Sequence, residues 1–151
     1  MSEHHAQIRW RRQTESFAYD DYDRTHDWEF GGGLRIQASS APEYRGRAEL
    51  PNPEEALVTA LSSCHMLTFL AIASRKRFVV DSYEDDAVGT MAKNEDGKIA
   101  ITHAVLRPRV VFGGERRPDA EELSRMHESA HRNCFIANSV RTEVAVEPRE
   151  G

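Results

Sequence analysis

The sequence predicts an α+β fold in which strands are grouped apart from two helices. Three observations indicate it: a long apolar helix over residues 53–76, strand patterns on both sides of that helix, and an amphipathic helix near the carboxyl end. Strands that are segregated from helices are typical of α+β proteins rather than of doubly wound sheets. The 151 residues are enough for one hydrophobic core, so we expect residues 1–151 to form a single domain.

The segment before the long helix predicts three strands and one irregular loop. Residues 6–14 alternate loosely between polar and apolar side chains, which predicts a first strand. Residues 15–27 are aromatic and acidic and predict a loop or edge segment. Residues 28–30 and 34–38 flank Gly31-Gly32-Gly33 and predict a hairpin, because glycine permits the positive φ angles of a tight turn.

The long helix has clear signals at both ends. Asn52 is a favourable N-cap, Pro53 suits the first helical position, and Glu55 stands three residues after the cap. Basic residues at 75–77 complement the negative end of the helix. A helix that is apolar on nearly every face is expected to be buried. One sheet of about six strands covers only one side of it, so we expect a second subunit to cover another.

The rest of the chain predicts strands and one more helix. Residues 79–92 and 99–112 are two long strand patterns, joined by a turn at Asn94-Glu95-Asp96-Gly97. Pro118 is expected to open an amphipathic helix that continues to about His131. Residues 142–146 predict a closing strand.

Composition excludes several classes of protein. The formal net charge is -5, so the chain lacks the basic face with which nucleic-acid binders neutralise phosphates. No apolar run is expected to reach the roughly 18 residues of a membrane span. The polar start, with no signal-peptide core, predicts a cytoplasmic protein that binds neither nucleic acid nor membrane.

The two cysteines are the residues most able to carry chemistry. Cys64 lies inside the long helix and Cys134 follows the second helix, 70 residues later. A thiolate attacks peroxide oxygen to give a sulfenic acid, and a second thiol then condenses with that acid. An arginine would stabilise the thiolate and a carboxylate would orient the arginine. The candidates for these two roles are Arg24, Arg45 and Arg47, and Glu54 and Glu55.

Two other interpretations of the cysteines stay open. Cys64 is also compatible with an inert core residue in a non-catalytic dimeric binding or structural protein, because free cysteine is among the most buried residue types. A Cys/His metal site is the other alternative, since His127, His131 and Cys134 follow an i, i+4, i+7 spacing and His65 adjoins Cys64. The sequence has no Cys-x-x-Cys or His-Glu-x-x-His motif, so we expect no metal.

Three segments resemble motifs of the OsmC/Ohr family of osmotically inducible and organic-hydroperoxide-resistance proteins. Asn52-Pro53-Glu54-Glu55-Ala56-Leu57, followed by Ser63-Cys64-His65, resembles the central-helix motif. Residues 130–140 resemble the motif around the second cysteine, and residues 83–89 resemble the strand after the central helix. The resemblance covers roughly residues 18–147.

This resemblance implies both an architecture and an activity. It implies an OsmC-like fold, with antiparallel sheets wrapped around a buried central helix in an intertwined homodimer. It implies a thiol-dependent peroxidase of the stress response, with Cys64 peroxidatic, Cys134 resolving, Glu54 as the functional glutamate and Arg24 as the best match to the arginine. Its partners would be a peroxide, organic by preference, and an external thiol or dithiol reductant. No cofactor is expected.

The distance between Glu54 and Cys64 limits how the roles of family residues can be assigned to this chain. Ten residues on a straight helix span about 15 Å, so Glu54 and Cys64 of one chain cannot touch if the helix is unbroken. Either the helix bends near Ser62-Ser63, or an arginine bridges the gap, or the partner subunit contributes.

Overall fold

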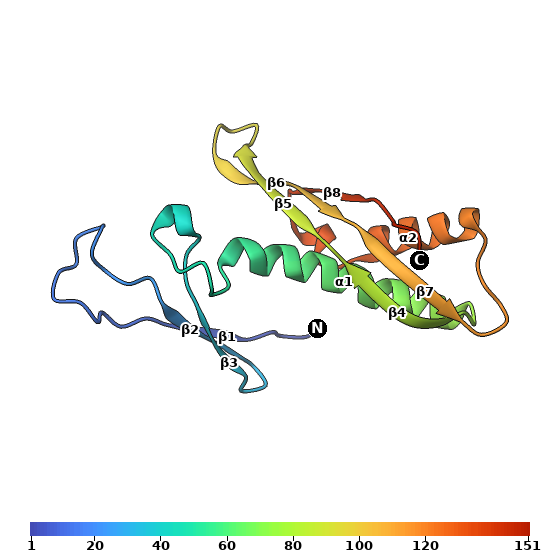
Figure 1. Ribbon diagram of the computed structural model, residues 1–151, viewed down its shortest axis with the longest axis horizontal. Helices are drawn as coiled ribbons and strands as arrows, with labels where there is room; N and C mark the ends of the chain where they lie inside the picture. Colours follow the sequence, from blue (N-terminus) through green and yellow to red (C-terminus); the bar gives the residue numbers. More distant parts are fainter. The chain divides into compact units, whose positions relative to one another are not determined.

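The computed structural model describes residues 1–151, which pack as two compact units, Met1–Ala56 and Leu57–Gly151. Figure 1 shows the elements of each unit. The first unit is an antiparallel three-stranded sheet in the order β1-β2-β3, followed by a short 3-10 turn. Its elements are β1 (Ala6–Arg9), β2 (His26–Phe30), β3 (Arg35–Ala38) and η1 (Pro42–Tyr44).

The hairpin of the first unit is confirmed, and its first strand is shorter than expected. Gly33 has a φ of +87° in the turn between β2 and β3, the conformation that favours glycine. Strand β1 ends at Arg9 rather than at residue 14. Beyond it the side chains bind the loop instead of a strand: the Trp10 indole donates to the Asp23 carbonyl at 2.8 Å. These contacts fold residues 10–25 back into an irregular loop.

Helix α1 (Pro53–Arg75) agrees with the predicted helix to within one residue. The Glu55 amide donates to Asn52 Oδ1 at 2.9 Å, and the Asn52 amide donates to Glu55 Oε2 at 3.3 Å. This reciprocal pair is a capping box, and it fixes where the helix begins.

The burial of α1 differs from the expectation of a helix buried on all sides. Its fully buried side chains form one stripe at a spacing of four residues: Leu61, His65, Phe69 and Ala73. Spacing of this kind places side chains on one face. A single chain therefore covers one face of α1 and leaves the other faces less enclosed.

The second unit contains more and shorter strands than the two long patterns indicated. Both patterns break near the middle, and the halves join different sheets: β4 pairs with β7, while β5, β6 and β8 form a three-stranded sheet. Strand β8 runs parallel to β6. The strands are β4 (Val79–Asp85), β5 (Val88–Lys93), β6 (Ile99–Leu106), β7 (Pro108–Gly113) and β8 (Glu143–Val146).

The break has a chemical cause at the junction of the strands. Pro108 has no N–H to donate to a ladder. The Arg107 amide donates to the Asp85 carboxylate at 2.6 Å instead of to a strand partner. The same carboxylate accepts the hydroxyl proton of Ser62 on α1. The expectation of a single sheet of about six strands was therefore wrong, because the chain forms eight strands in three sheets.

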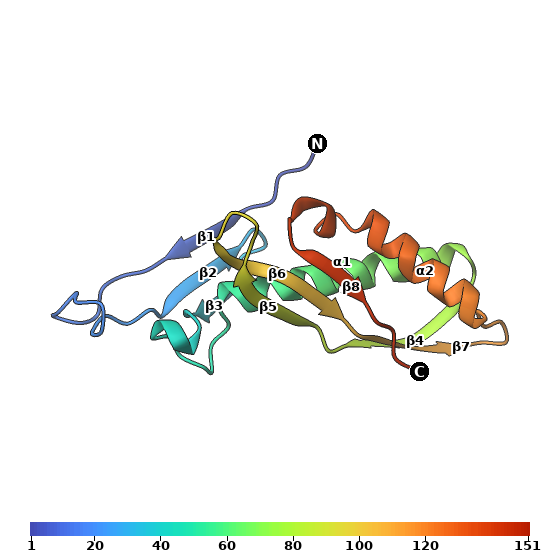
Figure 2. The same cartoon turned by 90° about the horizontal axis from the view of Figure 1, so that it is seen from above.

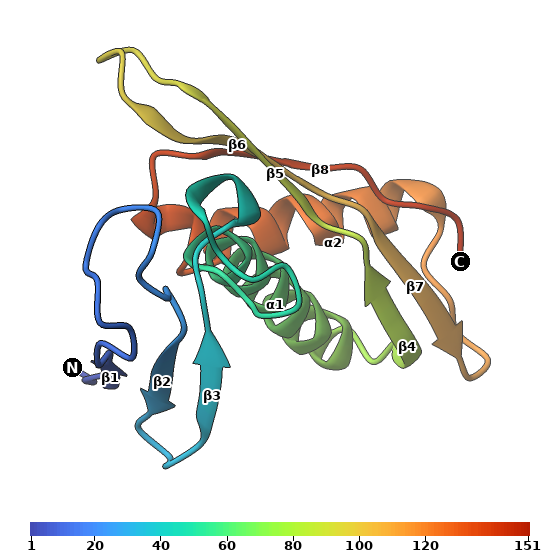
Figure 3. The ribbon, with the colours of Figure 1, turned by 60° about the vertical axis from the view of Figure 1, so that its left-hand side comes forward.

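The turn between β5 and β6 is confirmed, at the far tip of the hairpin in Figure 3. The Gly97 amide donates to the Asn94 carbonyl at 2.9 Å, and Gly97 has a φ of +71°. Helix α2 (Ala120–Asn133) begins two residues later than expected, because Asp119 rather than Pro118 marks its start. Asp119 Oδ1 accepts the Glu122 amide at 2.8 Å, so Asp119 is the N-cap.

The core of the second unit lies between α1, α2 and the β4–β7 pair. Figure 2 shows α2 running beside α1. Both helices and the strands contribute buried apolar side chains to one cluster, which consists of Phe69, Ala73, Phe78, Val110, Met126 and Ala130. The fold class is thus α+β, as the sequence predicted.

One sequence expectation about membranes needs correction. Helix α1 is long and apolar enough to cross a membrane by length and composition, although no such run was expected. The core helix of a soluble protein passes the same test. The buried stripe of α1 packs into the core of its own unit, which is the behaviour of a core helix.

We predict that Phe69→Ala strongly destabilises the protein. Phe69 is fully buried, and its ring lies against Tyr83, Phe112 and His127. Truncation leaves a cavity, so the free energy of unfolding is expected to fall by about 3–5 kcal/mol in urea titrations. Phe135→Ala is the matched control, because that ring is 81% exposed and its loss should cost less than about 0.5 kcal/mol. Equal effects of the two variants would contradict the assigned core.

Candidate functional site

Helix α1 holds Cys64 half-buried, next to the fully buried Leu61 and His65. The Thr68 hydroxyl donates to the Cys64 carbonyl at 2.8 Å, a back-bond one turn along the helix. This bond occupies the Cys64 carbonyl and leaves the Cys64 sulfur available to other groups. The nucleophile candidate is therefore accessible rather than enclosed in hydrocarbon.

Cys134 stands where α2 ends. Its amide donates to the His131 carbonyl at 3.3 Å, and its backbone is extended, with φ -70° and ψ 115°. The chain then makes a tight turn, in which the Asn138 amide donates to the Cys134 carbonyl at 3.0 Å. The side chain of Cys134 is only 1% exposed. The second thiol is thus buried beneath a short turn that it begins.

The fold brings the two sulfurs together. The Cys134 thiol and the main chain of Phe135 and Ile136 lie near enough to the Cys64 sulfur to influence its pKa. The Ala137 amide donates to the Cys134 sulfur at 3.4 Å. Both cysteines are free. The two cysteines, which are 70 residues apart in the sequence, therefore form one dithiol site within the second unit.

These contacts shift the two thiols in opposite directions. Burial, the largest single influence, raises the pKa of Cys64, yet hydrogen bonds from the Ile136 backbone, the Cys134 thiol and the Phe135 backbone outweigh it and lower that pKa below its ordinary value. Burial and the hydrogen bond to Cys64 raise the pKa of Cys134. Cys64 is therefore the more acidic thiol of the pair, and Cys134 is the less acidic one.

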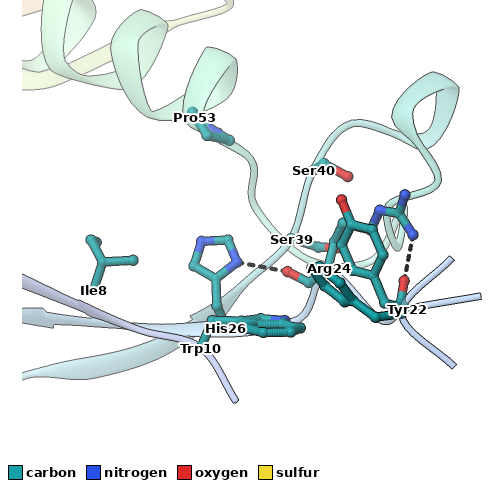
Figure 4. Close-up of a pocket in the computed structure, with 9 residues that line it drawn as sticks. Ile8, Trp10, Tyr22, Arg24, His26, Ser39, Ser40 and Pro53 are labelled. Atoms are coloured by element: carbon teal, nitrogen blue, oxygen red, sulfur yellow. Dashed lines mark hydrogen bonds between the residues drawn. The ribbon is translucent and has the colours of Figure 1, made fainter. Parts of the chain in front are cut away.

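Arg24 lies in the first unit, on an aromatic pocket of about 340 Å³ (Figure 4). Its guanidinium carbon stands 3.6 Å from the centre of the Tyr22 ring, and its nitrogens bond the carbonyls of Tyr22 and Tyr19. His26 Nδ1 donates to the Arg24 carbonyl at 2.7 Å, while its Nε2 accepts from Trp28. Arg24 is thus held by the loop that carries it. Its action on Cys64 stays a prediction.

The other candidate arginines also have partners within the first unit. Arg45 pairs with Asp20 at 2.8 Å and Arg47 with Glu49 at 2.6 Å. Glu54 is half-buried in the first turn of α1, and the helix runs without a break through Ser62 and Ser63. A helical rise of about 15 Å therefore separates Glu54 from Cys64. Because the helix does not bend, a bridging arginine or the partner subunit would have to connect Glu54 with Cys64.

A pair of buried histidines lies behind the site. His65 Nε2 and His127 Nδ1 are 3.1 Å apart, and the two side chains are 1% and 3% exposed. One of the two nitrogens carries a proton and donates it to the other. Burial is the main cause that lowers the pKa of each ring to about 4. Both imidazoles are neutral at pH 7 and link α1 to α2.

The side chains of the alternative Cys/His metal site do not gather into one site. The His127 ring faces His65, and the Cys134 sulfur faces Cys64. No group of three or more histidine, cysteine, aspartate or glutamate side chains is arranged to hold a metal ion. The spacing of His127, His131 and Cys134 serves packing and the dithiol contact instead.

Sequence reasoning missed the turn that follows Cys134. The Ala137 amide donates to the Cys134 sulfur at 3.4 Å, a main-chain contact that no side-chain motif reveals. No residue type signals such a contact, because every residue except proline carries an amide N–H.

Comparison with known proteins identifies relatives over nearly the whole chain. Residues 46–149 match the family model described as OsmC-like protein. The structure superposes on an OsmC-like protein of unknown function from Vibrio cholerae with 50% sequence identity and a TM-score of 0.94, over 99% of this chain and 100% of that one. No curated protein sequence matches significantly.

Two more distant structures have the same fold. An organic hydroperoxide resistance protein of Bacillus subtilis shares 17% identity at a TM-score of 0.67, over 99% of this chain and 98% of that one. An organic hydroperoxide resistance protein from Legionella pneumophila shares 13% identity at a TM-score of 0.70, over 100% and 98% of the two chains.

We predict that the histidine pair makes stability fall below pH 6.5. The unfolded rings bind protons near pH 6.5, whereas the folded rings resist protonation down to about pH 4. The unfolded state therefore binds more protons in this window, and stability is lost as the pH falls through it, by up to about 3 kcal/mol for each ring. Urea titrations between pH 4 and 7 measure the loss.

His127→Gln removes one of the two rings and should flatten this pH dependence. His103→Gln is the control, because His103 is exposed. If His127→Gln and wild type lose stability in parallel, the histidine pair is not the cause.

Proposed function

This chain belongs to the OsmC-like protein family, and on that premise we propose that it reduces hydroperoxides with Cys64 as nucleophile and Cys134 as resolving thiol. The observation that carries the proposal is the proximity of a half-exposed thiol with a lowered pKa to a buried thiol with a raised pKa. A thiolate is the nucleophilic form of cysteine, and a neighbouring thiol protects the sulfenic acid that forms.

The proposed reduction of a hydroperoxide has three steps. The Cys64 thiolate attacks the terminal oxygen of ROOH, the O–O bond breaks, and the leaving RO⁻ takes a proton to become ROH. The Cys134 thiol then attacks the Cys64 sulfenic acid, forming a disulfide and releasing water. Two thiol equivalents from an external reductant restore both cysteines by exchange and leave as a disulfide. No cofactor takes part in these steps.

An organic hydroperoxide fits the surroundings of the thiols. Leu67, one turn along α1 from Cys64, is 60% exposed, and the Phe135 side chain beside Cys134 is 81% exposed. Exposed apolar side chains next to a reactive group offer a binding surface for an apolar substrate. Two relatives in fold have names that refer to organic hydroperoxide resistance, which supports the same substrate class.

The proposed active unit is a homodimer of cytoplasmic subunits. Only 22% of the apolar stretch of α1 is buried within one chain. A second copy would cover the remaining apolar faces, as the family resemblance implies. In that arrangement Arg24 and Glu54, which lie in the first unit and at the start of α1, would orient the peroxide at a site shared between subunits. A cytoplasmic location would supply the thiol reductant.

We predict that peroxide consumption in the presence of a dithiol requires Cys64. Wild type should consume cumene hydroperoxide catalytically, and Cys64→Ser should fall to the uncatalysed rate because no nucleophile remains. Without the dithiol, Cys134→Ser should consume about one equivalent of peroxide and leave Cys64 as a sulfenic acid that dimedone labels, as mass spectrometry would show, whereas wild type should form the Cys64–Cys134 disulfide.

Ser124→Ala, on the exposed face of α2, is the control and should keep full turnover. Turnover that survives in Cys64→Ser would refute the assigned nucleophile. Absence of turnover in wild type with every peroxide and dithiol pair tested would favour the inert dimer instead.

We predict that the chain sediments as a dimer of two 17.1 kDa subunits. Leu67→Asp places a charge on the open apolar face of α1 and should shift sedimentation velocity profiles towards the monomer, because burying an unpaired charge is costly. Ser124→Asp adds the same charge on the exposed face of α2 and should stay dimeric. A wild-type monomer at all concentrations would contradict the homodimer.

A further inference from the structure

We infer that the external thiol attacks the Cys64 sulfur of the oxidised protein and releases Cys134 first, because the closed turn after Cys134 denies access to the other sulfur. A disulfide between Cys64 and Cys134 offers two sulfurs to a reducing thiolate, and the fold encloses them to different extents. This inference rests on the proposed function, since it concerns the half of the cycle that restores the dithiol.

Burial distinguishes the two sulfurs. The Cys134 side chain is 1% exposed, whereas Cys64 is half-buried on α1. The rate of thiol–disulfide exchange depends on access to the sulfur that is attacked. Cys64 therefore offers an external thiol a path that Cys134 lacks.

Four hydrogen bonds close the turn that covers Cys134. The main-chain amides of Asn138 and Ser139 each donate to a carbonyl of the turn at 3.0 Å. The same two residues add side-chain bonds: the Ser139 hydroxyl donates to the Phe135 carbonyl at 2.7 Å, and the Asn138 side chain donates to the Arg132 carbonyl at 3.0 Å. At the typical net strength of such bonds, the open turn is roughly a thousandfold rarer than the closed one.

The Ala137 amide prepares Cys134 to be the leaving group. It lies in the same turn and donates to the Cys134 sulfur at 3.4 Å. A thiolate that forms at this sulfur accepts a charge-assisted hydrogen bond, which is stronger than the bond to a neutral thiol. The donor is already in place, so the release of Cys134 needs no movement of the main chain.

The acidity of the two thiols acts in the opposite direction. A thiol of lower pKa leaves more easily, and Cys64 is the more acidic of the pair. Attack on Cys134 would therefore be favoured if both sulfurs were equally accessible. A pKa difference of one unit changes exchange rates by less than about tenfold. The closed turn has the larger effect, so access decides which sulfur reacts.

The inferred order of bond changes is as follows for a dithiol. Its thiolate attacks the Cys64 sulfur, the Cys64–Cys134 bond breaks, and the electron pair goes to the Cys134 sulfur, which then takes a proton. The second thiol of the reductant attacks the first within the mixed disulfide, and Cys64 leaves as a thiolate. The reductant departs as a disulfide and both cysteines are reduced.

The adduct of a monothiol locates the sulfur that is attacked. Wild type is oxidised with diamide, treated briefly with 2-mercaptoethanesulfonate, and quenched with N-ethylmaleimide, which traps the released thiol. Trypsin separates Cys64, in residues 48–75, from Cys134, in residues 133–141, so mass spectrometry reads each cysteine alone. We expect at least about tenfold more adduct on Cys64 than on Cys134. Equal adducts, or an excess on Cys134, overturn the inference.

A variant with a loosened turn tests the cause. Asn138→Ala combined with Ser139→Ala removes the two side-chain bonds of the turn, so adduct formation on Cys134 should rise about tenfold. Ser124→Ala, on the exposed face of α2, should keep the distribution of wild type. A Cys134 adduct that stays as rare in the double variant as in wild type contradicts the turn as the barrier.

A second measurement needs no disulfide. Cys134→Ser and Cys64→Ser each retain one thiol, whose labelling rate is compared between native protein and protein unfolded in urea. We expect the fold to slow labelling of Cys134 about a hundredfold or more and that of Cys64 less than about tenfold. Similar protection of the two thiols overturns the inference. None of these experiments uses peroxide, so failure of the proposed peroxidase would appear in the turnover assays alone.

Discussion

Two thiols that are 70 residues apart in the sequence lie close together in the second unit, and the site depends on this proximity. Helix α1 supplies the half-exposed Cys64, while the end of α2 brings the buried Cys134 and the short turn that follows it. Burial acts to raise both pKa values; neighbouring groups reverse this effect at Cys64, whereas the pKa of Cys134 stays raised. The difference in acidity between the two thiols is therefore set by where each sulfur lies, since both are cysteines.

The position of the dithiol depends in turn on how α2 packs against α1. The stripe Leu61, His65, Phe69 and Ala73 is the buried face of α1, and Cys64 borders it. His65 and His127 join the two helices by a hydrogen bond within an apolar core, with Phe69 stacked on His127. Neutral imidazoles can share such a bond without the cost of a buried charge. This packing fixes the end of α2 beside Cys64.

The sequence predicted those features that depend on local chemistry. Asn52 and Glu55 mark the start of α1, and Gly33 and Gly97 mark tight turns, because capping and positive φ angles depend on residue type. The long strand patterns did not show their breaks, since the interruption at Arg107 depends on a distant carboxylate, Asp85. Side-chain motifs located both thiols but not the Ala137 amide that donates to the Cys134 sulfur, because every residue except proline carries an amide N–H.

The buried stripe of α1 has a consequence for which substitutions the helix tolerates. Leu61, His65, Phe69 and Ala73 pack inside their own chain, so exchanges at these positions change the packing of the core. Leu67 is 60% exposed on the same helix, so an exchange there leaves no internal cavity. Variation among homologues should therefore follow the helical period, with the inward positions recording the core and the outward positions recording what the helix meets beyond its own chain.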